Sequence, residues 1–219
     1  MRQKASAVVV PVAAAALSIY AAQPQAGETV AAAQAFFSPT QERVILDLCR
    51  AAMATSDVFA AFAHGALPHM TLGSWIVTPD SVGTIVAQAR AATAAVTQVS
   101  LMVTLKAEPA MRAGYLDYQF IPEATPEVLD FHRAIHTAMA VSNQPHRRID
   151  LPGSWQPHIS LFTAPVAASN ALASVVRQLG DIRTLDVQRL GVVHFQNGIN
   201  TKLDAPLPPS AAATPPTNP

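Results

Sequence analysis

A five-residue phrase occurs twice in this chain, and it constrains the fold more than any other feature. Both copies, Pro68–Leu72 and Pro157–Leu161, consist of Pro, His, an apolar residue, a hydroxyl residue and Leu. Side chains alternate between the two faces of a β-strand. The phrase therefore predicts a strand whose His and hydroxyl share one face, while the apolar residue and the Leu share the other and become buried.

The regions around the two copies follow the same order of predicted elements. In each half, hydrophobic periodicity and helix-start signals indicate strand, helix, motif strand, helix and strand. We expect a duplicated β-α-β-α-β unit with pseudo-two-fold symmetry, which would place the two motifs opposite each other. The predicted segments are 29–37, 38–52, 67–77, 78–94 and 96–107, then 114–122, 126–141, 157–163, 165–179 and 183–195, with a hairpin return at 199–203.

The motif residues His69, Thr71, His158 and Ser160 are suited to acid–base chemistry on a phosphate. Histidine titrates near neutral pH, so one imidazole can accept a proton while the other donates one. The hydroxyls can donate hydrogen bonds to charged oxygens. A single such pair on a strand is usually an ordinary half-buried pair without function, and it is the second copy that favours a catalytic site.

These paired His-x-Thr/Ser motifs resemble those of the 2H phosphoesterase superfamily, which includes the LigT-like or "2′-5′ RNA ligase" proteins. The resemblance covers residues 28–204. It implies an α+β fold in which two antiparallel sheets, flanked by helices, enclose a central cleft. It also implies that His69 and His158 are catalytic, that Thr71 and Ser160 bind the substrate phosphate, and that no cofactor or metal is used.

We therefore predict a metal-independent cyclic phosphodiesterase, a hydrolase that opens a 2′,3′-cyclic phosphate on a nucleotide or an RNA end. Cleavage of 2′-5′ phosphodiester linkages is the alternative within enzymes. The alternative outside enzymes is a module that binds nucleotides or RNA ends without turnover. No phosphate-binding glycine loop is present, so the sequence does not support ATP-dependent ligation.

Four aromatic residues are further candidates to line the substrate site. Trp155 precedes the second motif and can stack on a nucleobase or pack in the core. Tyr115 and Tyr118 fall on opposite faces of one strand, so at most one of them faces the cleft. Phe162 follows the second motif.

The pair His132/His136 has the i, i+4 spacing of helical metal ligands, but Arg133 stands where a zinc protease has glutamate. We predict no metal site there.

The composition of the chain limits the kinds of molecule that it can bind. The formal net charge of the 219 residues is zero, which argues against an extended nucleic-acid surface and leaves a small nucleotide or an RNA end. The only cysteine, Cys49, excludes an internal disulfide. We expect a monomer.

The two ends of the chain differ from the body. Residues 1–27 form a basic start followed by an apolar run, the layout of a signal peptide, which predicts export to the periplasm or the medium and no membrane span in the mature form. An uncleaved anchor, or a cytoplasmic protein with a mis-assigned start, is the alternative. Residues 205–219 are rich in Pro and Ala and predict a disordered tail.

Overall fold

The computed structural model describes residues 26–55, 57–60, 65–139, 150–195 and 199–210. Within these ranges the protein is an α+β fold, as expected. The strands are β1 (Thr29–Phe37), β2 (Phe59–Ala60), β3 (His69–Val77), β4 (Val99–Pro109), β5 (Tyr115–Pro122), β6 (Ile159–Pro165), β7 (Thr184–Phe195) and β8 (Ile199–Pro206). The α-helices are α2 (Pro39–Thr55), α3 (Val82–Ala92), α4 (Pro126–Ala138) and α5 (Ser169–Gly180), with 3-10 turns η2 (Pro79–Ser81) and η4 (Val166–Ala168).

The order of the strands in the sheet reflects the duplication. The path runs β2-β6-β5-β4-β7-β1-β3, all neighbours are antiparallel, and β8 pairs with β7. From β6 to β3 this order is symmetric about its centre. The strands β6, β5 and β4 of one half are the repeat equivalents of β3, β1 and β7 in the other half. The approximate two-fold axis therefore passes between β4 and β7. These two strands pair over only Val99–Met102 and Thr184–Val187 before they diverge, so the sheet divides into two lobes.

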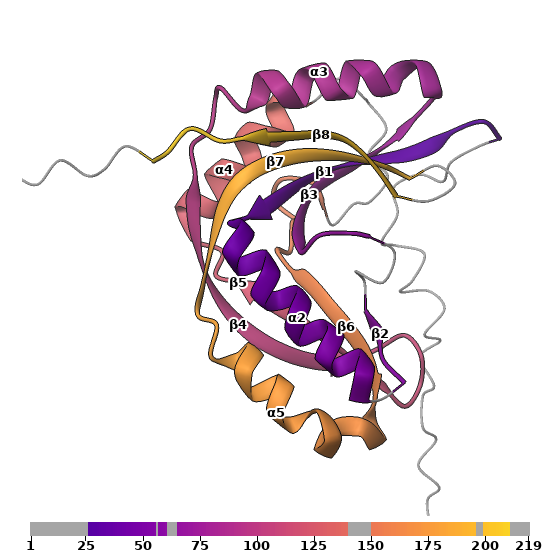
Figure 1. Ribbon diagram of the computed structural model, residues 1–219. Coiled ribbons are helices and arrows are strands. Elements are labelled where there is room, and N and C mark those ends of the chain that lie inside the picture. Colours follow the sequence, from indigo (N-terminus) through magenta and orange to yellow (C-terminus); the bar gives the residue numbers. More distant parts are fainter. Residues whose placement is uncertain (1–25, 56, 61–64, 140–149, 196–198, 211–219) are drawn as a thin grey trace, which may run out of the picture.

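Each lobe contains elements from both sequence repeats. The strand β7 of the second repeat joins β1 and β3, whereas β4 of the first repeat joins β5 and β6. The helices follow the same exchange, because α2 packs with α5 against the lobe of β6 and α4 packs with α3 against the lobe of β3. Figure 1 shows α3 and α5 at opposite ends of the strongly curved sheet. Each lobe is therefore built from elements of both repeats.

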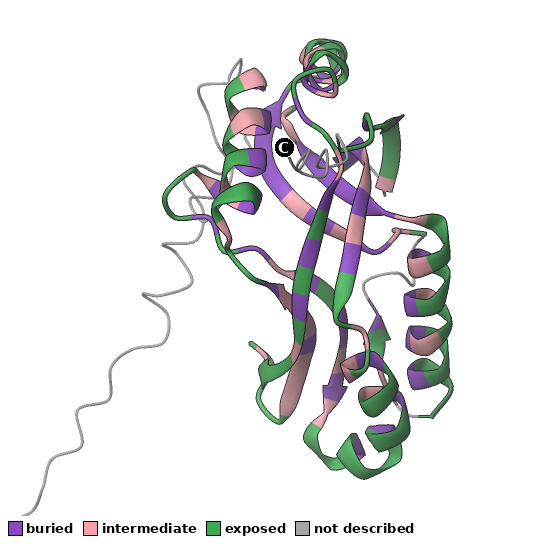
Figure 2. Ribbon diagram, turned by 90° about the vertical axis from the view of Figure 1, so that its left-hand side faces the viewer, coloured by how far each residue is buried: buried purple, intermediate pink, exposed green. Residues whose placement is uncertain are grey.

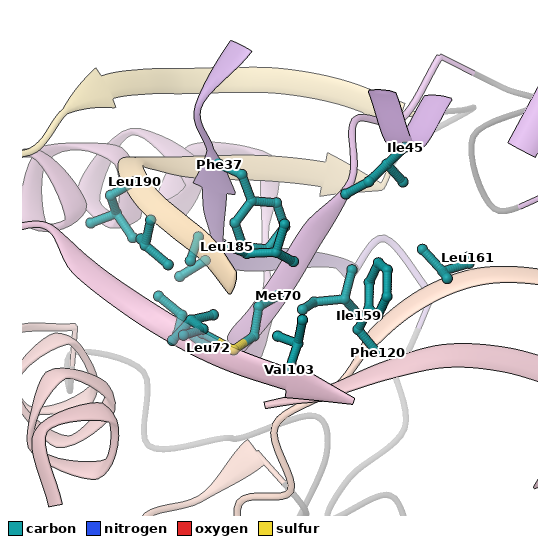
Figure 3. Packing of buried hydrophobic residues seen from close by; sticks show 14 of the residues in the cluster. Phe37, Ile45, Met70, Leu72, Val103, Phe120, Ile159, Leu161, Leu185 and Leu190 are labelled. Carbon is teal, nitrogen blue, oxygen red and sulfur yellow. The ribbon is translucent and has the colours of Figure 1, made fainter. Parts of the chain in front are cut away.

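The core lies on the helix-covered side of this sheet. The apolar members of both motifs, Met70 and Leu72 on β3 and Ile159 and Leu161 on β6, are fully buried, as the alternation predicts. Figure 3 shows them in one cluster with Phe120. Figure 2 shows the helices exposed on their outer sides and buried where they face the sheet. Because the apolar face of each motif strand is buried in this core, the opposite face, which carries the histidine, must point away from the core.

The predicted start of the tail at residue 205 is wrong for the described residues. Strand β8 continues to Pro206, Leu207 is buried, and its N–H donates to the carbonyl of Gln188. Pro208 in turn accepts a hydrogen bond from the N–H of Gln98. Composition alone did not reveal these partners, because they come from distant strands. The rest of the predicted tail (211–219) and nearly all of the predicted leader lie outside the described residues.

Among the described helices, none combines the length and the apolar character that a membrane span requires.

Candidate active site

The two motif histidines are held by the same local hydrogen bond. The Nδ1 of His69 lies 2.7 Å from the carbonyl oxygen of Leu67, and the Nδ1 of His158 lies 2.9 Å from the carbonyl oxygen of Gln156. A carbonyl only accepts, so Nδ1 carries the proton in each neutral ring and donates it. This tautomer leaves Nε2 of both imidazoles available for proton transfer. The residue before each histidine, Pro68 or Pro157, is buried.

A β-bulge follows the hydroxyl residue in both motifs. On β3 the register passes from the pair Gln34–Thr71 to the pair Ala33–Gly73, so Leu72 is the extra residue. On β6 it passes from the pair Gln119–Ser160 to the pair Tyr118–Phe162, so Leu161 is the extra residue. Bulges bend a strand and redirect its side chains, and they recur next to active sites. The final Leu of the repeated phrase therefore marks a bend at the same place in each lobe.

The histidines line pockets on their own lobes. His69 and Thr71 line a pocket of about 300 Å³ together with Ser74 and Phe195. His158 and Ser160 line a pocket of about 430 Å³ together with Tyr118 and Phe162. The sequence prediction that each histidine shares a face with its hydroxyl residue thus agrees with this arrangement.

Contacts between β3 and the segment before the second motif bring the two motifs together. The Oγ of Ser74 donates to Oδ2 of Asp150 at 2.6 Å, and both residues are buried. The indole Nε1–H of Trp155 donates to the carbonyl oxygen of Thr71 at 3.1 Å. Because β3 is an edge strand, its outward carbonyls need such donors. Trp155 therefore links the backbone of the first motif to the chain three residues before His158.

The helix α4 adds a third contact through His132. Its Nε2 lies 2.8 Å from the carbonyl oxygen of Leu72 and 3.0 Å from that of Asp150, so Nε2–H donates to both. The ring stacks on Trp155, with centroids 4.0 Å apart and planes 7° apart. Burial, followed by the neighbouring His136, lowers the pKa of His132 to about 4, which keeps the ring neutral. His132 therefore clamps the bulge of β3.

Among the described residues no group of three or more His, Cys, Asp or Glu side chains is arranged to hold a metal ion.

The motif histidines also interact electrostatically. Burial lowers the pKa of His69, and the charge of His158 lowers it further, against the opposing effect of the hydrogen bond to Leu67. The influence of His158 places the two imidazoles within electrostatic range of each other. Strands β3 and β6 contact each other although they lie near opposite ends of the sheet order, which is possible because the sheet curls.

The four aromatic candidates occupy different positions. Trp155 is buried against His132, but its edge also lines a pocket with Gln156 and His158. Tyr118 and Phe162 are buried, stack on each other with centroids 4.7 Å apart, and line the His158 pocket. Tyr115 lies outside these pockets, half-buried beneath the guanidinium of Arg112, which is 4.0 Å from the ring centroid.

Several residues of the site had no sequence signal strong enough to identify them. Ser74 and Asp150 belong to segments 76 residues apart, and His132 looked like half of an incomplete metal motif. Gln34 interrupts an otherwise apolar strand, and Gln119 sits between two aromatic residues. The signal that the sequence does offer for Gln34 is that of a lone polar residue in a buried strand.

At the level of sequence, the chain matches no protein-family model and no curated protein. Among solved structures it is similar to Usb1 of Kluyveromyces marxianus, with 12% identity and a TM-score of 0.48, over 84% of this chain and 100% of that one. It is also similar to LigT of E. coli in apo form, with 12% identity and a TM-score of 0.49, over 83% of this chain and 98% of that one. Both are members of the 2H phosphoesterase superfamily. The chain is also similar to the structure of E. coli LigT in complex with ATP. The identity is 12% and the TM-score 0.45, over 83% of this chain and 99% of that one.

Proposed function

We propose that this protein is a 2H-type phosphodiesterase that hydrolyses a 2′,3′-cyclic phosphate on a nucleotide or an RNA end. One observation carries the proposal. Each lobe presents an imidazole whose Nδ1–H is bound to a carbonyl, beside a hydroxyl residue and within a pocket. Two imidazoles that present Nε2 and two hydroxyls are what in-line opening of a phosphodiester requires: a base, an acid and donors for the charged oxygens.

The surroundings of the histidines favour one assignment of roles. Since burial lowers the pKa of His69, this ring is neutral at pH 7 and suited to act as the general base. Its Nε2 takes a proton from water as the water oxygen bonds to phosphorus. The bond from phosphorus to one ribose oxygen breaks, and Nε2–H of a protonated His158 gives that oxygen its proton. Thr71 and Ser160 donate to the non-bridging oxygens, and the product is a phosphomonoester.

The test is hydrolysis of a panel of 2′,3′-cyclic nucleotides in EDTA by the parent and by His69→Ala and His158→Ala. We expect turnover by the parent that survives EDTA and falls by at least about 100-fold in each variant, since general acid–base catalysis contributes at least this much. His136→Gln is a matched control, because His136 lies on α4 and lines neither motif pocket. Thermal unfolding of each variant separates lost chemistry from lost folding.

Two results would overturn the proposal. Activity that persists in either alanine variant would remove the two-histidine mechanism. A folded parent that hydrolyses neither cyclic nucleotides nor 2′-5′-linked oligonucleotides, yet binds nucleoside monophosphates, would identify a binding module instead.

The rim of the His158 pocket favours 2′-5′-linked oligonucleotides as a second candidate substrate. Phe59 lines this pocket and is 55% exposed, an unusual position for a large apolar ring. Its centroid lies 6.3 Å from that of Tyr115 and 5.8 Å from the guanidinium carbon of Arg112. Exposed aromatic and Arg side chains provide stacking surfaces for successive bases of a single strand. The same panel should therefore include dinucleotides with 2′-5′ linkages.

A further inference from the structure

The strand neighbours of the two motif hydroxyls are both glutamines. Gln34 on β1 pairs with Thr71, and Gln119 on β5 pairs with Ser160. Both pairs stand directly beside the bulges, so the pseudo-two-fold axis relates Gln34 to Gln119. Side chains of directly opposite residues leave the sheet on the same face, with their Cβ atoms about 5 Å apart. Each carboxamide thus belongs to the same face as the histidine and hydroxyl of its lobe.

The pockets repeat this relation. Both pockets that His69 lines also contain Gln34, and both pockets that His158 lines also contain Gln119. A glutamine side chain is longer than the threonine or serine side chain opposite it, so an amide at this position can reach the space in front of the hydroxyl.

The two glutamines differ in what their amides bind. The Nε2 of Gln119 donates to Oε2 of Glu108 at 3.3 Å. Gln34 is only 3% exposed, and no hydrogen bond joins its side chain to another residue in the part of the chain that the structure describes, yet its amide atoms are not among the fully buried atoms left without a partner. Its side chain lines two pockets, where a bound ligand can supply a hydrogen-bond partner for the amide. His69 and Thr71 line one of these pockets together with Gln34, so the amide belongs to the proposed phosphate site.

We infer that Gln34 is a substrate-positioning residue whose carboxamide N–H donates to a non-bridging oxygen of the phosphoryl group, beside the hydroxyl of Thr71. This inference rests on the proposed function and adds a binding contact to it. An amide suits this position because it donates without adding charge next to His69. A lysine there would disfavour protonation of the imidazole, and a carboxylate would repel the substrate.

The experiment compares Gln34→Met with the parent in two measurements. Met keeps the length and approximate volume of the side chain and removes its donors. Calorimetric titrations use nucleoside 2′- and 3′-monophosphates, the corresponding nucleosides and inorganic phosphate. Steady-state kinetics use the best cyclic nucleotide of the panel. Gln88→Met is the control, since Gln88 is a half-buried glutamine on α3 that lines neither motif pocket.

We expect Gln34→Met to weaken monophosphate binding and to lower kcat/KM by about 10- to 100-fold, the usual effect of losing a hydrogen bond to a charged group. Affinity for the nucleosides should stay within about twofold, because they carry no phosphate, and Gln88→Met should match the parent.

A purely structural role would instead lower the unfolding temperature and weaken binding of nucleosides and monophosphates alike, which would overturn the inference. An unchanged kcat/KM in Gln34→Met would also overturn the inference. If His69→Ala were inactive in the same assay, the two-histidine mechanism would still stand. A parent without turnover or phosphate binding would overturn both.

Discussion

His132 makes the stability of this protein sensitive to mild acid. In the folded state its ring is buried, stacks on Trp155 and donates to two carbonyls, and its pKa is lowered to about 4. In the unfolded chain the pKa returns to its ordinary value of 6.5. Between these two values the unfolded state binds a proton that the folded state does not, so the free energy of unfolding falls as the pH falls.

The size of this effect follows from the two pKa values. Well above pH 6.5 neither state is protonated at His132, and the residue contributes no pH dependence. On going down to pH 4 the difference in proton affinity removes about 3 kcal/mol of stability. That loss is a large part of the 5–15 kcal/mol typical of a domain. The charged neighbours of His132 are His136 and Arg133, both of which disfavour its protonation.

The measurement is urea unfolding of the parent and of His132→Gln at pH 7, 6, 5 and 4. Glutamine keeps an amide donor and does not titrate. The parent should lose about 3 kcal/mol more than the variant between pH 7 and pH 4. His69, His136 and His194, whose pKa values burial also lowers, are present in both proteins and largely cancel in the difference.

A parallel loss of stability in the parent and in His132→Gln would refute this reasoning. A direct check is the imidazole carbon shift of His132 in the folded protein. If that ring titrates near pH 6.5, its hydrogen bonds to Leu72 and Asp150 and its stacking on Trp155 do not hold it neutral.

Two further substitutions test the packing behind the motifs. A methyl group on Gly191 would lie 2.2 Å from Cε2 of Phe36, whose ring meets His69 edge-on. Gly191→Ala should therefore destabilise the protein by about 1–3 kcal/mol and lower kcat/KM, whereas Gly83→Ala, with open space around its Cβ, should be neutral or stabilising by thermal unfolding. Trp155→Phe keeps the ring on His132 but removes the donor to Thr71. It should cost about 1–3 kcal/mol and reduce turnover, and unchanged kinetics would show that this link does not position the motifs.

The sequence by itself determined the local chemistry of this protein. Alternation within the repeated phrase was enough to bury Met70 and Ile159 and to place each histidine on the face of its hydroxyl residue, because strand periodicity is a property of the backbone. The duplicated order of helices and strands followed from hydrophobic periodicity for the same reason. The bulges at Leu72 and Leu161 left no comparable signal, since a bulge exists only relative to the strand that pairs with it.

Only the tertiary structure decided how these pieces meet. The exchange of β4 and β7 between the lobes depends on pairing between strands far apart in the chain, which local propensity does not encode. The same holds for His132, whose spacing to His136 suggested half of a metal motif, and for Trp155, where packing and ligand contact were equally plausible. Their partners are backbone carbonyls of β3, and any residue type supplies a carbonyl. Gln34 acquires its significance in the same way, because the tertiary structure places it in the pocket that His69 and Thr71 line.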